Sequence, residues 1–118
     1  MSSRDDEATA LDLVRAARLV VAFRADLDKP AFLTDLKTQS AILHQLLIVG
    51  EATKRLSDEF RTRHAAIPWK LMAGMRDKLI HAYDAVDLEE VWKTAAIDIP
   101  RLLPALESVA PRDPASPP

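Results

Sequence analysis

The sequence predicts an all-α fold, and three features support this. Nearly half of its 118 residues are apolar (48%), which is enough for one hydrophobic core. Only two residues are glycine, and the prolines lie mostly outside the segments with helical periodicity. We therefore expect one domain, residues 1–110, folded as an up-and-down bundle of four or five helices. The proline-rich residues 111–118 form a tail in which no structure is expected.

The first expected helix spans residues 5–25. Its charged residues form a narrow polar stripe, and apolar residues cover most of the remaining surface. The stripe consists of Asp12, Arg15 and Arg18, and the apolar residues are Leu11, Val14, Leu19, Val20, Val21 and Phe23. An apolar arc this wide indicates burial on two sides, against the bundle and against a partner.

The second expected helical region spans residues 31–56, with an interruption near Lys37. The first helix cannot run on into this second region, because Lys29 precedes a proline and its backbone angles are pushed out of the α-helical range. Residues 41–49 are apolar on almost every side except at His44 and Gln45. In a helix interior Gly50 costs about 1 kcal/mol relative to alanine, so we expect another helix to pack closely there.

A third helix is expected from Pro68, whose missing N–H does no harm in a first turn, to about Ile80. Residues 57–66 before it are charged and predict an irregular segment or a short helix. Gly74 again argues for close packing against another element.

The fourth expected helix begins after Asp87, which forms the pattern of a capping box with Glu90. It runs to about Ile97. Pro100 and Pro104 then either kink this helix or begin a last segment that reaches residue 109.

The composition limits the classes of function. The net charge of −2 provides no global positive field, so RNA binding would need a local basic patch. The absence of cysteine excludes disulfides and thiolate chemistry and fits a reducing cytoplasm. The first ten residues are polar and acidic, unlike a signal peptide, and no apolar run is long enough for a membrane span. The three histidines lack a recognisable ligand spacing, so we expect neither a metal site nor a cofactor.

Four groups suited to phosphate chemistry lie within eight residues: Arg76, Asp77, His81 and Tyr83. Asp77 and His81 are four residues apart, so on a helix they share a face and the carboxylate can orient the imidazole. Arg76 and His81 would point roughly 140° apart on the same helix. Two arrangements bring them together. Either the helix ends near Ile80 and the turn swings His81 back, or a second copy of the chain completes the site across a two-fold axis.

The spacing of Arg76, His81 and Tyr83 matches the R-x4-H-x-Y motif of the HEPN superfamily. The flanking sequences IPW, GMR and VDLEEVW, with GEATKRLS upstream, resemble the HepT branch over residues 8–106. The resemblance implies a homodimeric HEPN bundle in the cytoplasm. It also implies a metal-independent endoribonuclease that acts as the toxin of a toxin–antitoxin pair.

The resemblance also implies roles for the residues. Arg76 would hold the scissile phosphate, His81 would be the general base, and Asp77 would orient His81 in a cleft between two protomers. Cleavage would leave a 2′,3′-cyclic phosphate. Tyr83 corresponds to the tyrosine on which a cognate minimal nucleotidyltransferase, the antitoxin, places AMP groups that silence the toxin.

Other interpretations stay open. Taken singly, an Arg, Asp or His at a helix end is more often a cap or a surface ion pair than a catalyst, and Tyr83 could simply pack on the turn. The only basic cluster upstream of the motif could guide RNA, although a solvated charged face is the commoner origin of such a cluster; it consists of Arg55, Arg61, Arg63 and Lys70. The protein could also be a non-catalytic nucleotide-binding or partner-binding subunit of a nucleotidyltransferase complex, or a purely structural helical dimer.

Overall fold

The computed structural model describes residues 3–81 and 85–115, and the expected all-α fold is confirmed. In chain order its elements are α1 (Ser3–Arg24), α2 (Lys29–Leu33), α3 (Leu36–Arg55), α4 (Asp58–Arg63), α5 (Trp69–Ala73), α6 (Met75–Leu79), β1 (Ile80–His81), β2 (Ala85–Val86), α7 (Leu88–Lys93), a π-helical turn η1 (Thr94–Asp98) and α8 (Ile99–Val109).

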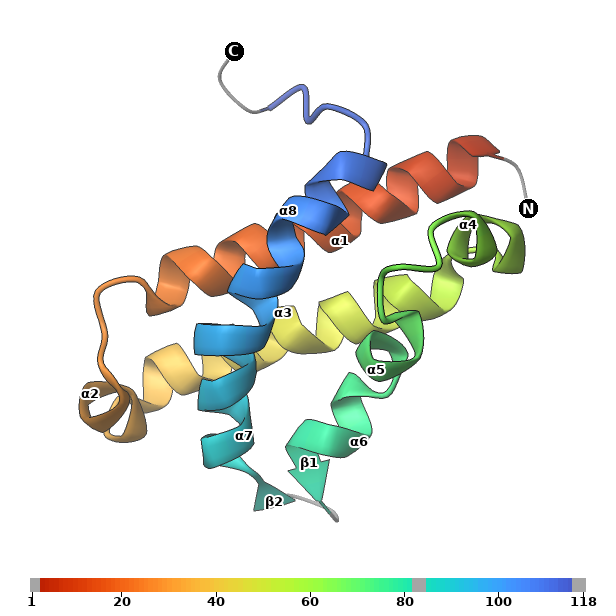
Figure 1. The fold of residues 1–118 in the computed structure, drawn as a ribbon. Coiled ribbons are helices and arrows are strands. Elements are labelled where there is room, and N and C mark those ends of the chain that lie inside the picture. The colour runs from red at the N-terminus through yellow and green to blue at the C-terminus, as the bar shows by residue number, and fades with distance from the viewer. Residues whose placement is uncertain (1–2, 82–84, 116–118) are drawn as a thin grey trace.

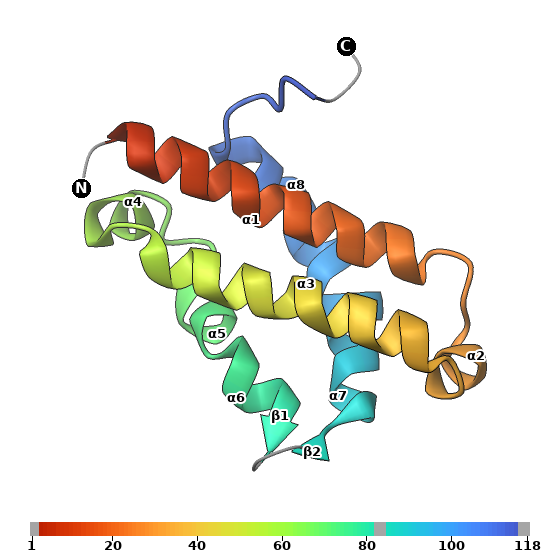
Figure 2. The same ribbon diagram turned by 180° about the vertical axis from the view of Figure 1, so that it is seen from behind.

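The two longest helices, α1 and α3, lie side by side and antiparallel (Figures 1 and 2). Helix α8 packs on α1, and the short helices α5 and α6 pack on α3. Each of these parts contributes fully buried aliphatic side chains to one core, among them Val20, Leu46, Leu79 and Ile99. Helix α6 ends and α7 begins at a small antiparallel hairpin of β1 and β2 at one edge of the molecule (Figure 1).

The second helical region is interrupted as expected, although the break precedes Lys37. It falls at Thr34 and Asp35, because the carboxylate of Asp35 accepts a hydrogen bond from the backbone N–H of Thr38 (3.0 Å) and caps α3. An aspartate with this geometry begins a new helix more favourably than it continues an old one.

The two glycines act differently. A β-carbon on Gly50 would lie 3.4 Å from the carbonyl oxygen of Met72, so the expected close approach of another helix is confirmed. The expectation for Gly74 was wrong, because its nearest neighbours are carbonyl groups of the preceding turn, Lys70 and Leu71. Gly74 instead separates α5 from α6, so the single third helix that we expected is two short helices.

The fourth helix continues through both prolines to residue 109. Directly before Pro100 the helix widens into η1, a π-helical turn. Proline lacks an N–H and its ring conflicts with the preceding turn, and a widened turn relieves such a conflict. The chain is therefore continuous from α7 to α8 but not regular.

A buried carboxylate ties α1 to α4. Asp6 accepts hydrogen bonds from the backbone N–H (2.9 Å) and the hydroxyl group (2.7 Å) of Ser57, whose own oxygen caps α4 at Phe60. Burial alone would raise the pKa of Asp6, but the two hydrogen bonds outweigh it and hold that pKa below its usual range. The N-terminal turn of α1 is thereby fixed to the start of α4.

The tail is anchored as far as Asp113, a residue for which we expected no fixed structure. Its nearly buried carboxylate receives two hydrogen bonds, of 2.8 and 2.7 Å, from the guanidinium of Arg15. Arg15 holds the pKa of Asp113 far below its usual range. Arg18 in turn contacts Glu107 of α8 (2.6 Å). Arg15 and Arg18 of the polar stripe therefore face α8 and the tail.

In the described ranges, no helix combines the length and the hydropathy that crossing a bilayer requires.

Candidate active site

Arg76 lies on the outer face of α6. Its neighbours Met75 and Leu79 are buried in the core and hold this short helix against α3. The side chain of Arg76 is exposed, and no described residue forms an ion pair with it. A guanidinium in this position can bind two oxygens of an incoming phosphate group without first breaking an internal pair.

The hairpin determines the direction of His81. Helix α6 ends at Leu79, and Ile80 has extended backbone angles (φ −118°, ψ 110°). Strand β1 then pairs Ile80 with Val86 and His81 with Ala85. The expected end of the helix near Ile80 is confirmed. Within the hairpin the side chain of His81 remains 59% exposed.

A carboxylate lies beside the imidazole, and it belongs to Asp87. The distance between Nε2 of His81 and Oδ2 of Asp87 is 3.2 Å. The other carboxylate oxygen accepts a hydrogen bond from the backbone N–H of Glu90 (3.1 Å), and the backbone N–H of Asp87 donates to the carbonyl of Leu79 (2.8 Å). Asp87 is therefore fixed by the start of α7 and by the end of α6 at once.

The electrostatics of Asp87 reflect these contacts. The backbone N–H of Glu90 lowers the pKa of the Asp87 carboxyl, partial burial opposes this, and the hydrogen bond with His81 adds to the lowering. The carboxylate is thus kept ionised beside the ring. An anion at Nε2 orients the imidazole and leaves Nδ1 as the nitrogen for other chemistry.

Asp77, the residue expected to orient His81, is exposed on α6. The helix that would have placed the two residues on one face ends between them. Among the described residues His81 has its carboxylate contact with Asp87, so the proposed role of Asp77 has no contact to support it. The sequence identified Asp87 only as a helix cap. The expected capping box is half formed, because the backbone N–H of Asp87 bonds to Leu79 and not to Glu90.

Tyr83, the expected site of AMP attachment, lies outside the described residues. Its flanks are described: His81 and Ala85 form the pair that closes the hairpin.

The basic cluster upstream is largely neutralised by neighbouring carboxylates. Arg55 lies 3.8 Å from Asp12, and within α4 Arg61 pairs with Asp58 and Arg63 with Glu59. Lys70 is exposed on α5. Helix α4 lies beside the start of α1, away from the β1–β2 hairpin (Figure 1). The arrangement favours a solvated charged face over a continuous RNA-binding surface.

The chemistry available at this site is acid–base and anion-binding chemistry. Arg76, His81 and Asp87 supply a cation, a titratable base and a fixed anion at one edge of the molecule. Across residues 3–81 and 85–115, no three His, Cys, Asp or Glu side chains gather in a way that could hold a metal ion.

Known proteins resemble this chain over most of its length. The model of the HepT-like ribonuclease family matches residues 13–109. A protein of Thermococcus cleftensis named "Probable ribonuclease HepT" is 46% identical over 91 residues, which cover 77% of this chain and 83% of the relative. A protein of Methanocaldococcus jannaschii named "Putative RNase" is 34% identical over 109 residues, which cover 92% of this chain and 100% of the relative. No solved structure matches the chain.

The two functions of Asp87 can be separated by substitution. Asparagine caps helices about as well as aspartate, so D87N should retain the cap and lose only the anion beside His81, whereas D87A loses both. We expect D87A to lower the urea midpoint of unfolding more than D87N. Because the pKa of Asp87 is lowered on folding, the advantage of wild type over D87A is complete above the ordinary pKa of 3.8 and is lost as the pH falls through the lower folded value.

The measurement is urea unfolding at pH 7 and at pH 3, followed by circular dichroism. Substituting the exposed Asp77 by alanine provides the control, because it should change the midpoint little at either pH. Equal midpoints for D87A and wild type at pH 7 would contradict the role of Asp87 as the link between α6 and α7.

Proposed function

The chain belongs to the HepT-like ribonuclease family, and we propose that it is a metal-independent endoribonuclease toxin that cuts RNA with Arg76 and His81. The observation that carries this proposal is the pairing at the hairpin. An exposed imidazole is held by an ionised carboxylate, while the exposed guanidinium of Arg76 has no ion-pair partner among the described residues. Relatives that cover most of this chain carry ribonuclease names.

The proposed reaction uses these groups together with a water molecule that supplies the proton of the leaving oxygen. His81 removes the proton of a ribose 2′-hydroxyl, whose oxygen attacks the adjacent phosphorus while the 5′-oxygen leaves and takes up a proton. The products are a 2′,3′-cyclic phosphate and a 5′-hydroxyl end. Arg76 stabilises the negative charge that develops on the phosphorus oxygens. Asp87 is a positioning residue that holds the imidazole through Nε2. Asp77 would act only from the rim of the site.

The surface of α3 supports the proposed homodimer. Apolar side chains continue along its outer face beside β2, and the two hollows on this face are lined by Leu36, Leu43, Leu47, Ile48, Val86 and Leu88 together with a few polar residues. Leu36 is 75% exposed and Val86 is 37% exposed. Burying this α3 face against a second copy would bring two β1–β2 hairpins towards a common axis, because Val86 lies next to the residue that pairs with His81. Two copies of Arg76 and His81 could then flank one phosphate.

Regulation forms the last part of the proposal. Tyr83 would accept AMP groups from a cognate minimal nucleotidyltransferase. The added phosphates would occupy the anion site of Arg76 and repel an incoming RNA backbone. This arrangement makes the antitoxin an enzyme that acts on the toxin.

The nuclease activity is tested with purified protein, RNA and a chelator of divalent cations. We expect wild type to cut, and R76A and H81A to lose roughly 100-fold or more of the rate, since transition-state charge stabilisation by Arg76 and general base catalysis by His81 each contribute about that much. R112A is the matched control, because Arg112 is also exposed and has no ion pair among the described residues. Equal cutting by wild type and H81A would refute the assignment.

The dimer is tested by placing a charge on the α3 face. L36E should convert the dimer to a monomer and lower nuclease activity with it, because a buried unpaired carboxylate opposes association. The side chain of Leu36 is already 75% exposed, so the fold itself should persist. L71E, at a leucine that is 69% exposed on α5, is the control and should remain dimeric. Light scattering after size-exclusion chromatography measures both, and a dimer that survives L36E would argue against this interface.

The regulation is tested by expressing the protein with a minimal nucleotidyltransferase of the same genome and measuring its mass. Wild type should gain whole multiples of an AMP group and lose nuclease activity, whereas Y83F should gain none and stay active. A stable complex without adduct, together with an absence of nuclease activity in the unmodified chain, would instead identify a non-catalytic subunit.

A further inference from the structure

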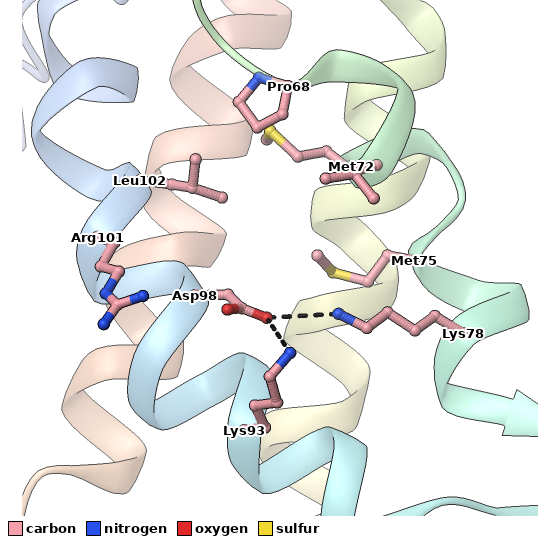
Figure 3. Close-up of a pocket in the computed structure, with 9 residues that line it drawn as sticks. Pro68, Met72, Met75, Lys78, Lys93, Asp98, Arg101 and Leu102 are labelled. Atoms are coloured by element: carbon pink, nitrogen blue, oxygen red, sulfur yellow. Dashed lines mark hydrogen bonds and ion pairs between the residues drawn. The ribbon is translucent and has the colours of Figure 1, made fainter.

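A pocket of about 360 Å³ separates the two helical arms of the molecule (Figure 3). Helices α5 and α6 form one side, and α7, η1 and α8 form the other. Its volume falls in the range of about 300–1,000 Å³ that is usual for small-molecule sites. Arg76, His81 and Asp87 do not line it, so the pocket is distinct from the candidate active site.

One end of the pocket is apolar. Met72 and Met75, which are 1% and 5% exposed, form its floor, and Leu102 faces them from α8 (Figure 3). Methionine side chains are flexible and polarisable, so a floor of this kind adapts to the shape of a bound apolar group. Leu71 also lines the pocket, and it is 69% exposed, so it lies at the mouth.

The other end is positively charged. Lys78 and Lys93 reach towards the carboxylate of Asp98, at 3.4 and 3.9 Å, from opposite sides of the gap (Figure 3). Arg101 lines the pocket as well and forms no ion pair with any described residue. Lys78 also lies 3.9 Å from the carboxylate of Glu90, so three cationic side chains face two carboxylates and the cluster keeps a net positive charge. Next to an apolar floor their attraction for an anion is screened less than it would be in open water.

We propose that this pocket binds a small amphipathic anion. A compact apolar body would lie on Met72 and Met75, and a phosphate, sulfonate or carboxylate head would interact with Arg101 and Lys93. This inference goes beyond ribonuclease activity and does not depend on it. The combination of an adaptable apolar floor with an unpaired guanidinium at its edge carries the proposal.

The geometry argues against larger occupants. The bridge from Lys78 through Asp98 to Lys93 spans the gap between α6 and α7–η1 and closes one end of it. A helix lying along the gap would have to break this bridge. A second copy of the chain on a two-fold axis would bring its own three cations against these three, and like charges in contact oppose association.

The test uses the fluorescent probe 8-anilinonaphthalene-1-sulfonate, which carries a sulfonate on an apolar ring system. We expect saturable binding to the wild-type protein, with a probe affinity that falls roughly tenfold in R101A, the loss typical of one charge-assisted hydrogen bond. L71E should weaken binding similarly by placing a carboxylate at the mouth. Both positions are exposed, so both variants should unfold at the wild-type urea midpoint.

Two controls exclude other binding surfaces. R112A removes an exposed arginine outside the pocket, and R76A removes the arginine of the candidate active site; neither should change the affinity for the probe. Wild-type affinity in R101A and L71E would overturn the proposal. A change of oligomeric state in L71E would overturn it as well, since the pocket would then be an interface between copies.

Competition identifies the source of the natural ligand. Decanoate represents acyl anions, and adenosine 5′-monophosphate represents aromatic phosphate esters. Inorganic phosphate carries the anionic group but no apolar part, so it should displace the probe much less well than either of these two compounds. Displacement by one of the first two supports the proposal and names the class, whereas displacement by inorganic phosphate alone would reduce the site to a simple anion site and overturn it.

Discussion

The carboxylate of Asp87 is the contact on which the candidate site depends. One of its oxygens begins α7, the other faces the imidazole of His81, and its backbone N–H bonds to the end of α6. A single residue thus joins the two arms and orients the candidate base. The carboxylate of Asp87 both caps α7 and contacts the imidazole of His81. A substitution that weakens the start of α7 therefore also changes the position of His81.

The sequence predicted most of the fold because helical periodicity and capping are local properties. The long helices, the short charged segment after α3 and the cap at Asp87 all depend on residues a few positions apart. The break at Gly74 and the π turn before Pro100 were not predicted. Both depend on how the chain packs against α1 and α3, which periodicity does not report.

The site was predicted at the level of residue types and only partly at the level of contacts. Arg76 and His81 lie at the edge of the molecule where a turn was expected, but the orienting carboxylate is ten residues from the one proposed. Helical spacing favoured Asp77, and that spacing is valid only while the helix continues. Because the β1–β2 hairpin replaces the last turn of the helix, Asp87, which follows β2, lies beside the imidazole of His81 in place of Asp77.

The contact between Asp113 and Arg15 brings the last described residues of the chain back to the middle of its first helix. This ion pair links the C-terminal segment to the first helix, so the two ends of the chain are not structurally independent. A recombinant version that stops at Ala110, or a protease that trims the proline-rich end, would leave Arg15 without its buried counter-ion and loosen α1 at a site remote from the cut.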